Sequence, residues 1–321
     1  MHPLSSPERS LRAAVHDFQH IFISIIIEAF PFILLGVFFS ALLQVFVSDA
    51  MIARLTPRNP VIGVLFGCLL GLLLPLCECG MIPVVRRLIR KGMPPYIGMV
   101  FIFAGPIINP IVLASTISAF RSQPEIAFAR MGIAFAVCML LGLLMYRFMK
   151  RSPLKLGIHS FASGRAGESA YGHNYNHGSL NSGFRERVHA TFNHASDEFF
   201  DIGKYLIIGA LLTGFVQATI DPNVLLSVSE HPAAATIVMM GAAFALSLCS
   251  TSDAFIASSF HGIFGPGALL GFLVFGPMVD VKSMLMLFSA FRSKVIVAIC
   301  LYLIAAVWLL SLAAEKLLTG Y

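Results

Sequence analysis

Residues 96–120 read YIGMVFIFAGPIINPIVLASTISAF, and this stretch decides the fold. It contains no charged side chain and exceeds the roughly 20 apolar residues that a helix needs to cross a bilayer. Gly105-Pro106 interrupts the apolar run near its middle. Proline breaks a helix because it has no N–H to donate and because its ring crowds the preceding turn. The stretch therefore predicts a membrane-embedded helix with a break near its centre.

The composition of the chain is that of a membrane protein. Of its 321 residues, 57% are hydrophobic and 12% are charged, whereas a soluble domain is about 25% charged and about 45–50% apolar. This balance excludes a water-soluble enzyme, a disordered chain and a fibrous repeat. The apolar runs are long and uninterrupted, which also excludes a transmembrane barrel. The net charge of +6 reflects Lys and Arg in cytoplasmic loops, so we expect no nucleic-acid partner.

Eight apolar runs predict an all-α polytopic bundle of about eight transmembrane helices. The expected spans are residues 21–47, 61–76, 96–120, 126–146, 202–220, 233–249, 266–291 and 295–314. The chain then divides into an N-terminal tail (1–20), a first membrane repeat (21–149), a linker rich in Gly, Ser, Asn and His (150–196) and a second membrane repeat (197–321). Lys and Arg concentrate before the first span and after the second and fourth. This pattern predicts that both termini and the linker lie in the cytoplasm, although Arg292 and Lys294 do not fit it.

The two membrane repeats resemble each other at an offset of 171 to 173 residues. The clearest matches are Leu76-Cys77 with Leu248-Cys249, and Gly105-Pro106-Ile107-Ile108-Asn109 with Gly276-Pro277-Met278-Val279-Asp280. Duplicated halves with interrupted helices at matching positions are typical of transporters. Non-helical backbone inside a membrane must be buried in protein or line a cavity. We therefore expect two broken or re-entrant helices at a shared cavity. Four crossings in each half, which we favour, would make the repeats parallel, and five would make them inverted.

A cysteine turn follows the second apolar span. Residues 75–80 read PLCECG, so that Cys77, Glu78 and Cys79 stand where the chain must turn. Thiolates are soft ligands for thiophilic centres, and two cysteines so spaced bring their sulfurs together only where the backbone is not helical. The alternative interpretation is that they are small apolar side chains packed in a turn. We take all three side chains as substrate-binding candidates and expect no resident metal.

The matching position in the second half is also polar. Residues 248–253 read LCSTSD and supply Cys249, Ser250, Thr251 and Asp253. These side chains are too polar for a lipid-facing helix, and they line a cavity, cap the helix that follows, or do both. We expect both roles and take the four side chains as substrate-binding candidates.

Asn109 and Asp280 follow the two Gly-Pro breaks. An ionisable group at the centre of a membrane helix costs about 2.5–3.5 kcal/mol and is a functional candidate by default. We therefore add both residues to the substrate-binding candidates. The alternative is that Asp280 interacts with Lys282 and only holds the fold. Glu28, inside the first span, is a candidate for proton relay.

Sequence patterns of enzymes and resident cofactors are missing. The chain has no Walker loop, dinucleotide fingerprint or Gly-x-Ser-x-Gly elbow. His173 and His177 in the linker have a spacing that suits metal ligands on a helix, but the surrounding glycines and asparagines favour a flexible linker. We expect no enzymatic activity and no cofactor, and ATP coupling would need another subunit.

Three stretches together resemble a family of bacterial permeases. They are residues 76–84 (LCECGMIPV), residues 104–110 (AGPIINP) and residues 249–255 (CSTSDAF). These are similar to the predicted permease family of the ArsP (methylarsenite efflux) and YraQ type. The resemblance implies a permease that moves a small solute by alternating access. The solute would be a trivalent organoarsenical, a thiophilic metal or a sulfur compound.

Two functions of other classes remain open. A membrane thiol–disulfide redox enzyme would cycle Cys77 and Cys79 through a disulfide and would need a partner thiol or quinone. A non-transporting scaffold subunit would tolerate replacement of the Cys and Asp positions. The partners that we expect are membrane lipid, a small-molecule or ion substrate, and a second copy of the chain or an accessory subunit.

Overall fold

The computed structural model is helical throughout the parts of the chain that it describes. These are residues 6–46, 49–57, 59–73, 77–148, 199–200, 203–215 and 231–319. Within them β structure is limited to an isolated bridge between His261 and Phe264. The expected all-α membrane fold is therefore confirmed. The linker expected at 150–196, with His173 and His177, lies outside the described residues.

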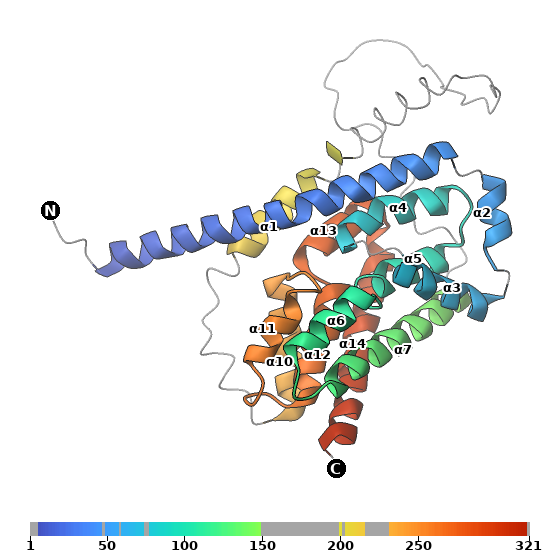
Figure 1. Cartoon of the computed structure of the whole chain (residues 1–321). Helices are drawn as coiled ribbons and strands as arrows, with labels where there is room; N and C mark the ends of the chain where they lie inside the picture. Colours follow the sequence, from blue (N-terminus) through green and yellow to red (C-terminus); the bar gives the residue numbers. More distant parts are fainter. Residues whose placement is uncertain are drawn as a thin grey trace, which may run out of the picture.

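The described helices follow one another in two groups along the chain (Figure 1). The first group is α1 (Ser6–Phe46), α2 (Asp49–Leu55), α3 (Pro60–Leu73), α4 (Glu78–Arg90), α5 (Pro95–Ala104), α6 (Pro110–Ala119) and α7 (Glu125–Phe148). The second is the helix Gly203–Phe215 and then α10 (Pro232–Leu246), α11 (Asp253–Ser259), α12 (Pro266–Met278), α13 (Val281–Ala290) and α14 (Ser293–Thr319). Because α1 begins at Ser6, helix extends into the tail that we expected at residues 1–20.

Four described segments are long and apolar enough to span a membrane by length and composition. They are Phe18–Ser40, Glu125–Phe148, Pro266–Ala290 and Ser293–Leu318. The apolar helices α3, α5, α6, α10 and Gly203–Phe215 are shorter. At 1.5 Å per residue, ten-residue helices such as α5 and α6 are about 15 Å long, which is half of the roughly 30 Å hydrocarbon core. Short helices in series therefore replace a single crossing in part of this bundle.

The first Gly-Pro dipeptide lies in a break, as expected. Helix α5 ends at Ala104, residues 105–109 form a turn, and α6 begins at Pro110. Asn109 is the N-cap of α6, and its side-chain oxygen accepts a hydrogen bond from the Ile111 N–H at 2.9 Å. A proline at the first helical position and an asparagine cap before it both favour a helix start. The break thus follows from local chemistry.

The second Gly-Pro dipeptide differs from the expectation. Gly276 and Pro277 lie inside α12, which continues to Met278. The break falls instead at residues 279–280, where Asp280 caps α13 by accepting the Ser283 N–H at 2.6 Å. Proline removes one hydrogen bond within the last turn of α12, whereas the carboxylate cap fixes where the next helix starts. The cap, rather than the proline, therefore sets the position of this break.

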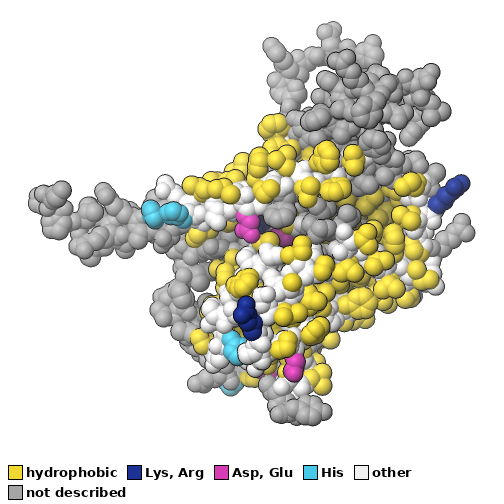
Figure 2. Space-filling view, viewed as in Figure 1, with side chains coloured by type: hydrophobic (Ala, Val, Ile, Leu, Met, Phe, Trp, Pro, Cys, Tyr) yellow, Lys and Arg dark blue, Asp and Glu magenta, His cyan; other side chains and the backbone are white. Residues whose placement is uncertain are grey.

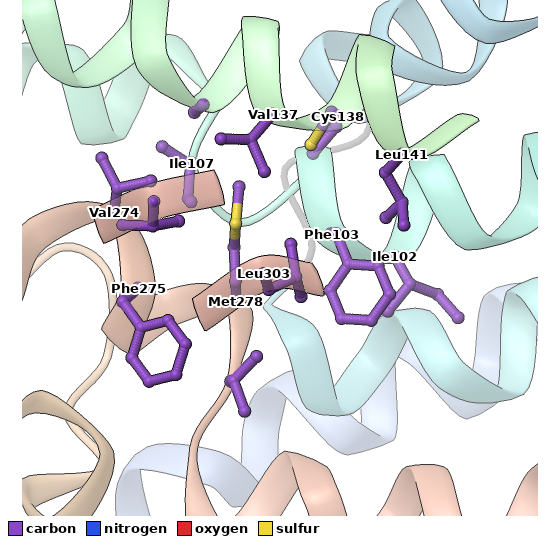
Figure 3. Close-up of a cluster of buried hydrophobic side chains, with 14 of the residues drawn as sticks. Ile102, Phe103, Ile107, Val137, Cys138, Leu141, Val274, Phe275, Met278 and Leu303 are labelled. Carbon is purple, nitrogen blue, oxygen red and sulfur yellow. The ribbon is translucent and has the colours of Figure 1, made fainter. Parts of the chain in front are cut away.

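The two interrupted helices form the centre of the molecule. The residues of α5 from Tyr96 to Ala104 and those of α12 from Gly267 to Met278 are buried. Figure 3 shows a cluster of buried side chains that includes Phe103 of α5, Val137 of α7, Phe275 of α12 and Leu303 of α14. Pro106 and Pro277 are both buried, and α5 contacts α12. Interrupted backbone is thus enclosed by protein, as a membrane requires.

The outer helices carry the large exposed apolar side chains. They stand on α1, α3, α7, the helix Gly203–Phe215 and α14, and examples are Ile27, Leu73, Phe148, Phe215 and Leu301. Figure 2 shows hydrophobic side chains covering most of the described surface on the face in view, with few charges among them. A soluble monomer rarely exposes a continuous apolar surface of this kind. This surface is therefore the one that meets lipid.

The two halves contact each other through their central helices. Helix α4 of the first half packs against α13 of the second, and α11 of the second packs against α6 of the first. Figure 1 shows α4 and α13 next to each other beneath α1. Helices α6 and α13 stand at matching places in the order of their halves, as do α4 and α11. That the halves are duplicates stays a prediction.

Candidate functional site

The Cys77 turn opens helix α4. Cys77 is the N-cap with extended backbone (φ −72°, ψ 165°), and α4 begins at Glu78. This change from extended to helical backbone places the Cys77 and Cys79 thiols where they interact with each other. Both cysteines are free, and Cys79 is buried. The two thiols therefore lie together where extended backbone at Cys77 changes to helix at Glu78.

Three buried ionisable side chains meet where α4 packs against α13. Glu78 is 5% exposed, Asp280 1% and Lys282 6%. The Lys282 ammonium lies 3.7 Å from Oδ2 of Asp280 and also interacts electrostatically with Glu78. We call these three residues the acid–lysine cluster. It joins one half of the chain to the other.

Close backbone packing holds α4 in place. A side chain at Gly36 of α1 would collide with the backbone of Gly80, one turn into α4. The Ser40 hydroxyl of α1 donates to the Pro83 carbonyl at 3.4 Å. Gly209, in the helix Gly203–Phe215, faces the Lys282 backbone, where an added Cβ would lie 3.1 Å from Cα. Small residues at such crossings allow membrane helices to approach closely.

Ser247 connects the end of α10 to the start of α13. It has a positive φ of 46°, a left-handed conformation that non-glycine residues seldom adopt. Its hydroxyl accepts the Val281 N–H at 3.2 Å and lies 3.4 Å from the Thr213 hydroxyl. Ser247 was not among the predicted site residues, because a serine at the end of an apolar helix gives no local signal of this contact.

The Cys249 turn follows Ser247 and lies near the acid–lysine cluster. The Thr251 hydroxyl donates to Sγ of Cys249 at 3.6 Å. Cys249 interacts electrostatically with Glu78 and with Glu28 of α1. The structure thus brings Cys77, Cys79 and Cys249 around the same carboxyl group. Asn109, by contrast, serves as the cap of α6.

Arg130 forms a second polar contact between the halves. It lies in α7, is 1% exposed, and binds Asp253 of α11 at Nη2–Oδ2 2.7 Å and Nη1–Oδ1 3.1 Å. Its Nη1 also donates to the Thr116 hydroxyl of α6 at 2.9 Å, and its Nη2 donates to the Ser250 carbonyl at 3.3 Å. A planar guanidinium suits such a two-pronged carboxylate contact. The Arg130 contact therefore joins α6 and α7 of the first half to α11 of the second half.

Arg130 was not among the predicted site residues, although a signal was present. Arg130 is a cation inside the apolar run 126–146, and such residues are functional candidates by default. Asp253 and Ser250 were chosen as substrate contacts, and in the structure the Asp253 carboxylate and the backbone carbonyl of Ser250 accept hydrogen bonds from Arg130. The partner could not be inferred, because it lies 123 residues away in sequence.

A cavity lies at the ends of α6 and α11. It encloses about 480 Å³ and is lined by residues that follow these helices, including Gln123, Glu125, His261 and Phe264. The His261 ring nitrogen lies 3.2 Å from Oε1 of Gln123. Arg130 stands on the helix that begins at Glu125, so the cavity and the Arg130 contact belong to the same end of α7.

A resident metal site is not supported by the geometry. Within the described ranges, no three His, Cys, Asp or Glu side chains are grouped so that they could hold a metal ion. The chemistry present is instead a pair of thiols, a third thiol nearby, and buried carboxyls beside an ammonium. This set can bind a small polar or soft solute and exchange protons with it.

A family model described as a predicted permease matches residues 14–316. The chain belongs to the predicted permease family. It is 45% identical over 301 residues to the UPF0718 protein YcgR of Bacillus subtilis (strain 168), a match that covers 94% of this chain and 96% of that protein. It is 37% identical over 276 residues to a putative two-component membrane permease complex subunit of Streptococcus mutans serotype c, covering 86% and 87%. No solved structure matches this permease.

Both polar contacts of this permease fall inside the matched residues. The acid–lysine cluster and the Arg130 contact each join the two halves. The resemblance noted from residues 76–84, 104–110 and 249–255 is therefore confirmed at the level of the family.

Proposed function

We propose that this permease moves a small solute across the bacterial inner membrane and binds it where the cysteine turns meet the acid–lysine cluster. The observation that carries the proposal is the burial of Glu78, Asp280 and Lys282 at a contact between the two halves. Ionisable groups in a membrane are expensive and mark solute or ion pathways. Helix starts at α4 and α13 add backbone N–H groups at the same place, as in transporters with interrupted helices.

The thiols favour a soft solute. Cys77 and Cys79 interact with each other, and Cys249 interacts electrostatically with Glu78. A trivalent organoarsenical with two hydroxyl groups would condense with two thiols, forming two As–S bonds and releasing two water molecules. A sulfur compound would instead make hydrogen bonds and soft contacts with the same groups. A thiophilic metal is less well suited, because the described residues offer no group of three ligands for it.

Alternating access is supported by the two contacts between the halves. The acid–lysine cluster lies at the α4–α13 packing, and the Arg130 contact lies at the α6–α11 packing. If one packing separates while the other holds, the solute site opens to one side of the membrane at a time. The cavity of about 480 Å³ beside α6 and α11 would serve as the vestibule on that side.

Transport by reconstituted protein tests this function. Purified protein in liposomes would be assayed with methylarsenite, thiosulfate and divalent metal ions, using Cys77→Ser and Cys249→Ser. We expect uptake of one of these solutes, a loss of at least tenfold in both variants, and wild-type uptake in Cys68→Ala, which replaces a buried cysteine of α3. Failure of the wild type with every solute, or uptake indifferent to Cys77 and Cys249, would refute the proposal.

We further propose that the chain works with a second membrane subunit. The support is the printed name of the Streptococcus mutans relative, a subunit of a two-component complex. Liposomes that contain this chain alone would then show measurable uptake, and addition of the second subunit would raise the uptake rate at least threefold. Full uptake by the chain alone would contradict the requirement for a second subunit.

A thiol–disulfide redox enzyme is the other candidate that an observation favours. Cys77 and Cys79 are adjacent free thiols, so a disulfide between them would release two protons and two electrons to an acceptor such as a quinone. Mass spectrometry of the purified protein after quinone addition would then show the loss of two hydrogens at these cysteines. An unchanged mass would exclude this activity.

A further inference from the structure

Two buried carboxyl groups share one cation in the acid–lysine cluster. Asp280 has two partners: its Oδ1 accepts the Ser283 N–H at 2.6 Å, and its Oδ2, which accepts no hydrogen bond from the described residues, lies 3.7 Å from the Lys282 ammonium. Glu78 has fewer partners. Its Oε2 is buried and accepts no hydrogen bond from the residues that the structure describes. Lys282 and the start of α13 are thus both engaged by Asp280.

The other titratable groups around Glu78 add no second cation. Glu28 on α1 is exposed, and Cys77, Cys79 and Cys249 are thiols. Among the groups of the described residues that interact electrostatically with Glu78, Lys282 is the cation, while Asp280 and Cys77 would carry negative charge. The start of α4 contributes a partial positive charge to Glu78, but none of its N–H groups reaches Oε2.

A buried carboxylate without a partner is strongly unfavourable, and such a group takes up a proton instead. We propose that Glu78 carries a proton while Asp280 is ionised and paired with Lys282, and that this proton is exchanged during transport. The inference rests on the proposed function and names its coupling ion. When the site accepts a cationic solute, the proton passes from Glu78 to water on the open side. The total charge of the cluster is then conserved.

Infrared spectroscopy measures the proton on Glu78 directly, without a known substrate. The full chain in lipid would be compared with Glu78→Gln at neutral pH, using the C=O stretching band of a protonated buried carboxyl group. We expect the Glu78→Gln variant to lose this band. Glu125→Gln, which replaces an exposed carboxylate at the start of α7, should keep it. A wild-type spectrum identical to that of Glu78→Gln would overturn the proposal.

Charge balance gives a sharper signature. Asp280→Asn leaves Lys282 for Glu78, so the proton should depart and the band should vanish at neutral pH. Lys282→Met leaves two carboxyl groups without a cation, so both should be protonated and the band should grow about twofold. A structural role for these residues predicts neither change. A band indifferent to both substitutions, in variants that elute as the wild type does, would also overturn the proposal.

Transport separates this inference from the proposed function. With methylarsenite, thiosulfate and divalent metal ions as probes, an imposed pH gradient should change wild-type uptake at least threefold. Any uptake that remains in Glu78→Gln should be indifferent to the gradient. Wild-type uptake that ignores the gradient would refute proton coupling alone. Absence of wild-type uptake would refute the proposed function, and the infrared bands would still decide whether Glu78 holds the proton.

Discussion

Arg130 is a cation kept inside the bundle by complete engagement of its two terminal nitrogens. Nη1 and Nη2 donate to Asp253, Thr116 and the Ser250 carbonyl. Taking a guanidinium and a carboxylate out of water costs several kcal/mol for each ion, and good geometry with extra hydrogen bonds offsets this cost. The pair therefore links the halves strongly only as long as both partners are present.

Removal of one partner of this pair should destabilise the protein strongly. We expect Asp253→Asn to lower the free energy of unfolding by about 3–5 kcal/mol, because an uncompensated buried cation remains. Denaturant unfolding in mixed micelles, followed by circular dichroism, measures this loss. Arg121→Ala, at an exposed cation, should stay within about 0.5 kcal/mol of wild type.

The double variant Arg130→Met with Asp253→Leu checks the explanation. It removes both charges together and should recover much of the loss. If the double variant loses more free energy of unfolding than Arg130→Met and Asp253→Leu lose when their separate losses are added, the charges do not hold the pair together.

At the scale of single elements, Asn109 combines two roles that can be separated. It caps α6 through the Ile111 N–H, and it was also expected to contact the solute. Asn109→Ala should cost about 1 kcal/mol of stability, whereas Asn109→Ser keeps a capping oxygen and should cost little. Thermal unfolding measures the cap, and liposome uptake measures the contact. Normal uptake in Asn109→Ser would assign Asn109 to the cap alone.

The crossing of α1 and α4 depends on the absence of side chains. Gly36→Ala would drive a methyl group into the Gly80 backbone, and overpacking of this kind typically costs about 1–3 kcal/mol. Gly132→Ala in α7 meets no atom within 4 Å, so the better helix propensity of alanine should make it neutral or slightly stabilising. Melting temperatures in detergent compare the two. Equal melting temperatures would show that α1 is free to shift over α4.

Local chemistry explains which elements could be predicted from the sequence. The break at Gly105-Pro106 and the turn at Cys77 depend on proline, asparagine and capping groups within a few residues, so both were anticipated. The second break moved to residues 279–280, because the Asp280 cap outweighs Pro277 in fixing the start of α13. The contacts of Arg130 with Asp253 and of Ser247 with Val281 join distant parts of the chain. A pattern within one helix cannot specify such partners, and only the packing of the halves brings them together.

At the scale of the whole molecule, the Arg130 contact and the acid–lysine cluster both join the halves, but they differ in how completely their polar groups are paired. The Arg130 contact has a bidentate ion pair with further hydrogen bonds, so it holds α11 firmly against α6 and α7. The acid–lysine cluster is looser, with buried oxygens of Glu78 and Asp280 that accept no hydrogen bond from the described residues. The residues from Cys249 to Asp253 belong to both contacts, because Cys249 lies near Glu78 and Asp253 binds Arg130. A shift of this turn would therefore alter both contacts together.

Weakening the Arg130 contact should expose the solute site to one side of the membrane. In a variant that retains Cys249 as its only cysteine, Arg130→Gln should raise the labelling rate of Cys249 by a membrane-impermeant maleimide at least tenfold. A decrease of about 1.4 kcal/mol in the stability of the closed state already raises the population of the open state tenfold. Breaking the ion pair is expected to cost more than that. Labelling from each face of oriented vesicles identifies the open side. Gly132→Ala in the same background serves as the control and should label as slowly as its parent. A rise from both faces at once would mean that Arg130→Gln loosens the bundle generally, and an unchanged rate would show that the α6–α11 packing does not guard the site.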